Sequence, residues 1–86
     1  MIMKPIQFSH HARQQMAERG ASEDEVVETI HTGERIPAKQ DRQSYRKNFQ
    51  YNDLWGGRKY AIKQLLAIVA EETDTLIVIT VITFYF

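Results

Sequence analysis

The spacing of apolar and polar positions is helical in the first third of the chain. Ser9 is a helix-capping residue type, Gly20 suits the left-handed position that follows a helix, and the ten residues between them include no Gly, Pro or β-branched residue. We therefore expect a helix over residues 10–19.

A second helix is expected over residues 23–32. Ser22 and Glu25 have the spacing of a capping box, and acidic residues follow Ser22 at the positive end of the helix dipole. Gly33 ends the apolar spacing. The short link between the two segments predicts a tight αα-hairpin.

After Gly33 the period becomes two. Residues 44–51 alternate between polar side chains and aromatic or long ones, which predicts a half-exposed strand. Trp55-Gly56-Gly57 predicts a turn, and residues 60–70 predict the next strand. Its even positions are mostly apolar, whereas the other face begins with Lys59 and Lys63 and then becomes apolar.

The segment TLIVITVITFYF, residues 75–86, is apolar on both faces. It is short and rich in Thr for a membrane span, so we expect the buried central strand of a sheet. Its last three residues, Phe84-Tyr85-Phe86, either dock into the core or form part of a partner surface.

These elements predict one α+β domain over residues 1–86. The expected architecture is an N-terminal αα-hairpin packed on one face of a three- or four-stranded antiparallel sheet. Pro37–Arg42 is the expected loop, because Pro37 interrupts any regular pattern.

Charged residues are unevenly distributed along the chain, although the net charge is +0. Between Glu34 and Lys63 eight basic residues stand against three acidic ones, whereas Glu18–Glu28 is acidic. The middle of the chain is therefore expected either to attract a polyanion or to carry solvated cations on edge strands.

The composition also excludes several kinds of chemistry. With no Cys, a disulfide framework, a thiol nucleophile and a Cys-based zinc site are excluded. Residues 1–8 do not resemble a secretory signal, so we expect a cytoplasmic protein without a membrane association.

Chemistry at the first helix centres on His11. At about 100° per residue, His11, Gln15, Glu18 and Arg19 fall within one quadrant of the helix. A histidine, a carboxylate and a guanidinium on one stripe are either an acid/base site or an ordinary polar stripe.

Cations near the second turn suggest a phosphate ligand. Lys59 and Lys63 project to one face of the expected strand and Arg58 lies at its start, so they can bind and neutralise a transferring phosphate. Together with His11, whose ordinary pKa is about 6.5, they make metal-free RNA cleavage through the 2′-hydroxyl chemically feasible.

A metal site is not expected. One can be drawn from His10, His11 and Glu18, but the two histidines point in different directions and no HExxH-type spacing is present. We therefore expect neither a metal nor another cofactor.

The order of residues resembles a known family. The run F-S-x-H-A-x-x-x-M-x-x-R-G, the capped acidic helix ending at Gly33, and an AIVAEE strand with an ITV-x-x-FYF ending are similar to the family labelled domain of unknown function 4258. That family is similar in expected fold to the BrnT and RelE/ParE-like toxins, which are often encoded beside an antitoxin. The resemblance implies functional positions at Ser9, His11, Arg19, Arg58, Lys63 and Thr80. It also implies a basic residue at the position of Gln15, where this chain departs from the family.

Our leading hypothesis is a toxin-like, metal-independent endoribonuclease. In it His11, Arg19 and Lys63 are catalytic, and substrate is bound by Arg58, Lys59, Gln15, Glu18 and Thr80. Thr80 either hydrogen-bonds in the site or is satisfied within the sheet. The expected partners are an antitoxin protein and RNA or the ribosome.

Two alternatives belong to other classes. One is a non-catalytic module that binds a protein through the apolar last strand or the stripe on the first helix. The other is a homodimer whose last strand pairs across a two-fold axis.

Overall fold

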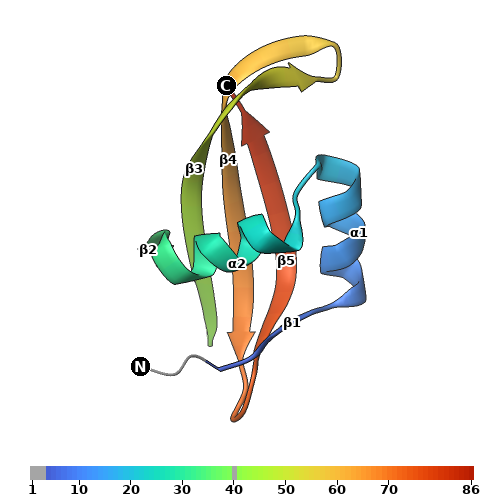
Figure 1. The fold of residues 1–86 in the computed structure, drawn as a ribbon. Helices are drawn as coiled ribbons and strands as arrows, with labels where there is room; N and C mark the ends of the chain where they lie inside the picture. Colours follow the sequence, from blue (N-terminus) through green and yellow to red (C-terminus); the bar gives the residue numbers. More distant parts are fainter. Residues whose placement is uncertain (1–3, 40) are drawn as a thin grey trace.

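The computed structural model of the chain describes residues 4–39 and 41–86. Two helices and five strands follow one another along the chain (Figure 1). In order they are β1 (Ile6–Phe8), α1 (His10–Arg19), α2 (Glu23–Thr32), β2 (Glu34–Ile36), β3 (Arg42–Trp55), β4 (Arg58–Glu71) and β5 (Leu76–Tyr85).

All five strands form one sheet in the order β1-β5-β4-β3-β2. β1 runs parallel to β5, and every other neighbouring pair is antiparallel. The expected three- or four-stranded antiparallel sheet is therefore wrong, because the sheet is mixed and has five strands. β1 and β2 have only three residues each, too few for an alternating pattern to stand out in the sequence.

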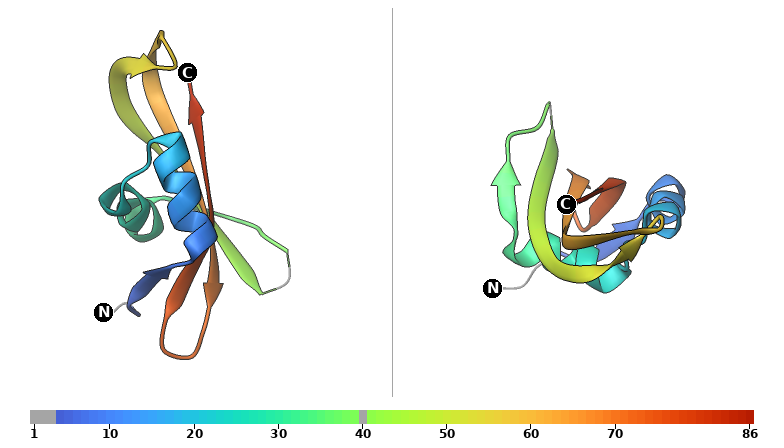
Figure 2. Two further views of the ribbon diagram at one scale, coloured as in Figure 1. Left: turned by 90° about the vertical axis from the view of Figure 1, so that its right-hand side faces the viewer. Right: turned by 90° about the horizontal axis from the view of Figure 1, so that it is seen from above.

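The expected helical hairpin on one face of the sheet is also wrong, although both helices have the expected bounds. α1 lies beside β5 at the edge of the sheet, whereas α2 crosses in front of β3 and β4 (Figures 1 and 2). Gly20, with φ of 76°, ends α1, and the chain turns there so that the helices cross instead of running side by side. A two-residue link fixes the closeness of two helices but not their crossing angle.

The central strand is β4, not the last strand. β5 is second from the edge, between β4 and the short β1. Its two apolar faces therefore do not reflect a central position, and only one of them faces the helices.

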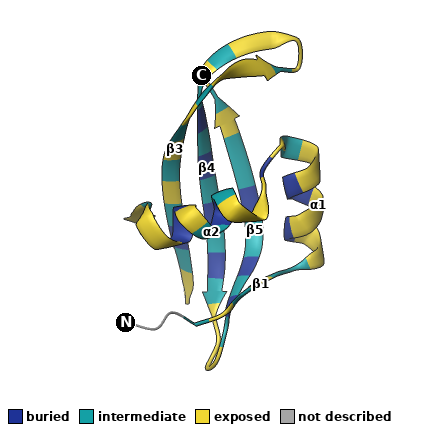
Figure 3. Cartoon of the chain, in the orientation of Figure 1, coloured by how far each residue is buried: buried dark blue, intermediate teal, exposed yellow. Residues whose placement is uncertain are grey.

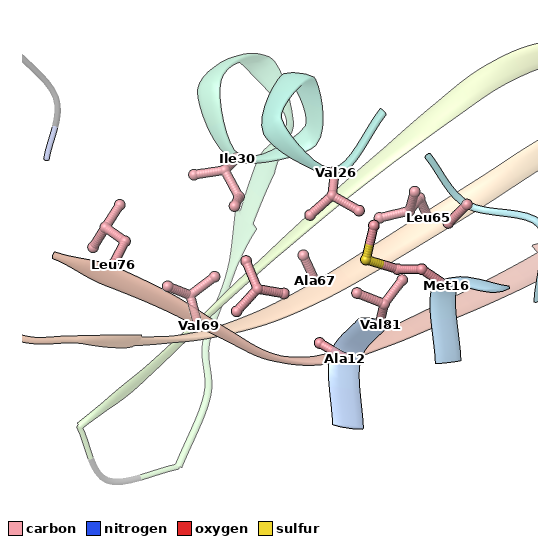
Figure 4. Close-up of a cluster of buried hydrophobic side chains, with 11 residues drawn as sticks. Ala12, Met16, Val26, Ile30, Leu65, Ala67, Val69, Leu76 and Val81 are labelled. Atoms are coloured by element: carbon pink, nitrogen blue, oxygen red, sulfur yellow. The ribbon is translucent and has the colours of Figure 1, made fainter. Parts of the chain in front are cut away.

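The hydrophobic core lies between that helix-facing side of the sheet and the two helices (Figure 4). α1 contributes Ala12 and Met16 and α2 contributes Val26 and Ile30. The sheet side is made of Leu65, Ala67 and Val69 on β4 and Leu76, Val78 and Val81 on β5.

β3 and β4 continue beyond this core as a curved two-stranded arm (Figures 1 and 2). Their pairing shifts register between Gln50 and Asp53, and Asn52 there has a positive φ of 49°. Most of the arm is exposed (Figure 3), and its tip bends back toward the end of α1. Neither helix in residues 4–39 has the length and apolar character to cross a membrane.

Candidate functional site

One face of the sheet is not covered by either helix. Along β4 the odd positions from Lys63 to Val69 are buried, whereas the even positions from Ile62 to Ala70 are half-buried. Because successive side chains of a strand point to opposite faces, the odd positions face the helices and the even positions face away from them. We call the face that carries these even positions the open face.

Strand register defines the open face residue by residue. Ile82 of β5, Leu66 of β4 and Arg46 of β3 lie opposite one another, and Phe84, Gln64 and Asn48 form the next row. The rows on the other side are Thr80, Ile68 and Ser44, and then Ile77, Ala70 and Arg42. The open face is therefore apolar along most of β5 and β4, with Thr80 and Gln64 as exceptions, and polar to basic along β3.

The exposed end of this face is aromatic. Phe84 is 45% exposed and Phe86 is 61% exposed, and backbone hydrogen bonds between Phe86 and Ile62 hold the last residue in the sheet. Tyr85 faces the helices and donates from its hydroxyl to the carbonyl of Arg19 at 2.7 Å. Docking into the fold and exposure on the surface were the two alternatives for the chain end. Tyr85 docks, whereas Phe84 and Phe86 remain on the surface.

Gln15 and Arg19 hold α1 to the outer edge of β5. The side-chain oxygen of Gln15 accepts a hydrogen bond from the Val81 N–H at 2.8 Å, and the Arg19 guanidinium donates to the Val81 carbonyl at 2.9 Å. β1 pairs with β5 only as far as Val78, so these side chains bond the edge groups that follow. Two residues expected in a catalytic site are thus engaged with the backbone of one β5 residue.

Ser9 also belongs to this contact. Its hydroxyl accepts from the Ala12 N–H at 3.0 Å as the cap of α1, and it lies 3.3 Å from the carbonyl of Ile79.

Lys63 is buried beneath the junction of the two helices. Its ammonium group donates to the Gly20 carbonyl at 2.8 Å and lies 2.8 Å from the Glu25 carboxylate. Burial acts to raise the pKa of Glu25, but the hydrogen bonds from Lys63 and the Ser22 N–H and the Lys63 charge outweigh it, and the pKa lies below its ordinary 4.5. The lysine expected to neutralise a phosphate therefore already has a carboxylate partner.

The other expected cations lie on the arm. Arg58 and Lys59 are exposed at its tip, and the Arg58 guanidinium is 5.8 Å from the centre of the Tyr60 ring. Nearby, Trp55 stacks on Tyr85 with ring centres 4.8 Å apart. This aromatic contact brings the tip of the arm against the end of α1.

His11 and Glu18 are exposed on a different flank of α1. They are seven residues apart and so lie almost in line along the helix, about 140–160° away from the Arg13 direction. Arg13 forms an ion pair with Glu23 of α2. The flank with His11 and Glu18 therefore faces away from α2.

The structure does not bring the expected catalytic residues together. His11 is in the first turn of α1, and Lys63 binds Gly20 at the other end of the same helix, about 13 Å away at 1.5 Å per residue. Thr80 lies half-buried on the open face, in the row with Ile68. Within the described residues no group of three His, Cys, Asp or Glu side chains is arranged to hold a metal ion.

Two hollows lie on the β2–β3 side of the molecule. One, of about 330 Å³, is lined by Thr32, Gly33, Glu34, Arg46, Lys47, Asn48 and Gln64. The other, of about 430 Å³, is lined by Arg35, Ile36, Pro37, Ala38, Arg42 and Gln43. Neither includes His11 or the other residues expected to be catalytic.

Sequence reasoning named the apolar last strand as an alternative protein-binding surface, but it did not find the open face that β4 and β5 form together. The signal was present in β4, where both faces become apolar after Lys63, but a strand pattern does not say which face the helices cover. The sequence identified Glu25 only as a capping residue. Its ion pair with Lys63 could not be predicted, because the two residues are 38 positions apart in sequence.

Comparison with known proteins gives one match. A family model described as a domain of unknown function (DUF4258) matches residues 8–83. No curated protein and no solved structure matches the chain.

Proposed function

The chain belongs to the family described as a domain of unknown function (DUF4258), and we propose that it is a protein-binding module, the globular member of a toxin–antitoxin type pair. The observation that carries this proposal is the open face, where apolar residues of β4 and β5 lie in register and end in the exposed Phe84 and Phe86. Contiguous apolar surface with a polar rim is typical of protein-docking sites.

The occupant that fits this face is an amphipathic helix with acidic residues on one flank. The opposite face of the same sheet already binds such a helix, since α2 buries Val26 and Ile30 and pairs Glu28 with Lys47 of β3 at 3.0 Å. The open face repeats that chemistry, with apolar positions on β4 and β5 and with Arg42 and Arg46 on β3. Arg42 has no acidic partner within 4.0 Å among the described residues, so it is available to a carboxylate of the partner.

A homodimer that pairs its last strands edge to edge has less support. β4 occupies one edge of β5, and β1 and then α1 occupy the other. A second copy would therefore have to use a different surface.

RNA cleavage by His11 remains a prediction that the geometry supports less than protein binding. Lys63 and Arg19 are engaged in contacts within the fold. Arg46 is on β3, whereas His11 is on α1, and β5 and β4 lie between them. At about 4.8 Å per strand spacing, a single phosphate cannot contact both residues.

The proposal can be tested by NMR with a synthetic amphipathic peptide that forms a helix with acidic residues along one flank. On its addition we expect methyl shifts at Leu66, Ile68 and Ile82, and small changes at Leu65 and Val69, which are neighbours in sequence on the covered face. Equal shifts on both faces, or none, would contradict docking on the open face. Cleavage of a mixed-sequence RNA in excess chelator by the wild type but not by His11→Ala would favour the endoribonuclease.

A further inference from the structure

The two long edges of the sheet differ in how far their backbone groups are hydrogen-bonded. At the β5 edge, Gln15 and Arg19 bond the backbone beyond the end of β1. At the other edge, β2 pairs with β3 only from Ser44 to Arg46. β3 continues to Trp55, so most of its outer edge has no neighbouring strand among the described residues.

The direction of the backbone groups on this edge follows from the hydrogen bonds of Ile62. Ile62 exchanges both of its backbone hydrogen bonds with Phe86, on the β5 side of β4. In an antiparallel ladder the residue opposite it, Gln50, then has its N–H and C=O directed away from β4. The same holds for Asn48, which lies opposite Gln64, two residues along β4.

The limits of this free edge are set at both ends. At its start Gly33 lies so close to β3 that a Cβ there would be 2.7 Å from the Arg46 carbonyl, and Arg46 is the last residue of this edge that the described part of the chain covers. At its end, the register shift after Gln50 and the positive φ of Asn52 interrupt the ladder. Two residues, Asn48 and Gln50, therefore offer an ordered pair of donors and acceptors.

A hollow adjoins the place where the free edge begins. The 330 Å³ hollow is lined by the end of α2, by β2 and by Arg46, Lys47 and Asn48 of β3. Its side chains already bond one another, since Arg46 pairs with Glu34 at 2.6 Å and Gln64 donates to Asn48 at 2.9 Å. The hollow is thus a polar and preformed space beside the unpaired backbone.

We propose that the β3 edge at Asn48 and Gln50 binds an extended polypeptide segment, which adds to the sheet as a further strand and places one polar side chain in this hollow. Main-chain donors and acceptors in β geometry are complementary to an extended backbone. At about 3.3 Å per residue, two rungs fit a segment of about five residues. The site is an edge and not a face, so this inference goes beyond the docking proposed above.

The experiment uses the intact protein and a displayed library of random twelve-residue peptides. Selected peptides are measured against the wild type, Gln50→Pro and Gln50→Ala. The Pro variant removes the outward N–H without removing a bond to β4, whereas the Ala variant keeps the backbone and removes only the side chain. We expect affinity to fall at least about tenfold in Gln50→Pro and to change little in Gln50→Ala, since a lost hydrogen bond of about 1.4 kcal/mol corresponds to a factor of ten.

Amide hydrogen exchange provides the second readout. In the free protein the N–H groups of Asn48 and Gln50 should exchange fast and that of Phe49 slowly, and the bound peptide should slow the first two. Peptides that bind Gln50→Pro as tightly as the wild type, peptides that leave Asn48 and Gln50 unprotected, or a library that yields no binder would each overturn the inference. Phe84→Asp distinguishes the two sites, because it should impair the open face and leave binding at the β3 edge unchanged.

Discussion

The ammonium group of Lys63 lies 2.8 Å from the carboxylate of Glu25, and the side chain of Lys63 is only 6% exposed. The same ammonium group donates to the carbonyl of Gly20. One lysine of the central strand therefore connects the end of α1 to the first turn of α2. This contact explains the buried lysine as part of the fold.

Removing Lys63 should destabilise the protein strongly. We expect Lys63→Ala to lower the free energy of unfolding by about 2–4 kcal/mol, because it leaves the Glu25 carboxylate and the Gly20 carbonyl without their partner. Urea denaturation measures the loss. Lys59→Ala, a lysine on the same strand that is exposed, is the control and should stay within about 0.5 kcal/mol of the wild type.

The Glu25 ion pair also predicts a dependence of stability on pH. The pKa of Glu25 is lowered in the folded protein, so its contribution is present above the ordinary value of 4.5 and is lost as the pH falls through the folded value. The melting temperature of the wild type should therefore fall more steeply below about pH 4.5 than that of Glu25→Gln. Parallel curves for the two proteins would show that the pair contributes nothing to acid sensitivity.

Gln15 is predicted to be a structural acceptor. In Gln15→Leu the Val81 N–H loses its partner at a buried position, so we expect a loss of about 1–3 kcal/mol in the free energy of unfolding. Gln15→Lys should be no better, because an ammonium group cannot accept a hydrogen bond. Gln14→Leu, at the neighbouring exposed position, controls for the effect of helix propensity.

Gly20 is predicted to be required by a close contact and not only by its backbone angle. A Cβ at Gly20 would lie 2.7 Å from the Trp55 ring, whereas at Gly56, whose φ is also positive at 59°, it would meet nothing within 4 Å. Both Ala variants carry the strain of a positive φ, about 1 kcal/mol. We expect Gly20→Ala to lose more stability than Gly56→Ala and to change the fluorescence of Trp55, while Gly56→Ala leaves the emission unchanged.

The helices could be predicted because their signals are local. Ser9 and Ser22 accept hydrogen bonds from the N–H groups of Ala12 and Glu25, as their positions before the two helices indicate. β1 and the parallel pairing could not be predicted, because Ile6 meets Leu76 across 70 positions and three residues carry no period. Long separations in sequence likewise hid the partners of Gln15 and Lys63, which lie 66 and 38 positions away and which were expected to face a substrate.

The open face shows what periodicity alone does not predict, namely which face of the sheet the helices cover. The alternation along β4 correctly separates Ile62, Leu66 and Ile68 from Lys63 and Leu65. Which set the helices cover depends on the crossing of α2 over the sheet, and no local pattern encodes that crossing. The excess of basic residues between Glu34 and Lys63 overstates the free positive charge of the folded protein. Ion pairs such as Arg46 with Glu34 and Lys47 with Glu28 neutralise part of it.

The most direct test of the central proposal is the affinity of two surface variants for an amphipathic helical peptide with acidic residues along one flank. Phe84 and Leu54 are both exposed apolar residues, 45% and 62% respectively, but only Phe84 lies on the open face. Phe84→Asp should weaken binding by at least about a hundredfold, since it places a charge in an apolar contact, and Leu54→Asp should bind like the wild type. Equal affinities for Phe84→Asp and the wild type would contradict docking on the open face.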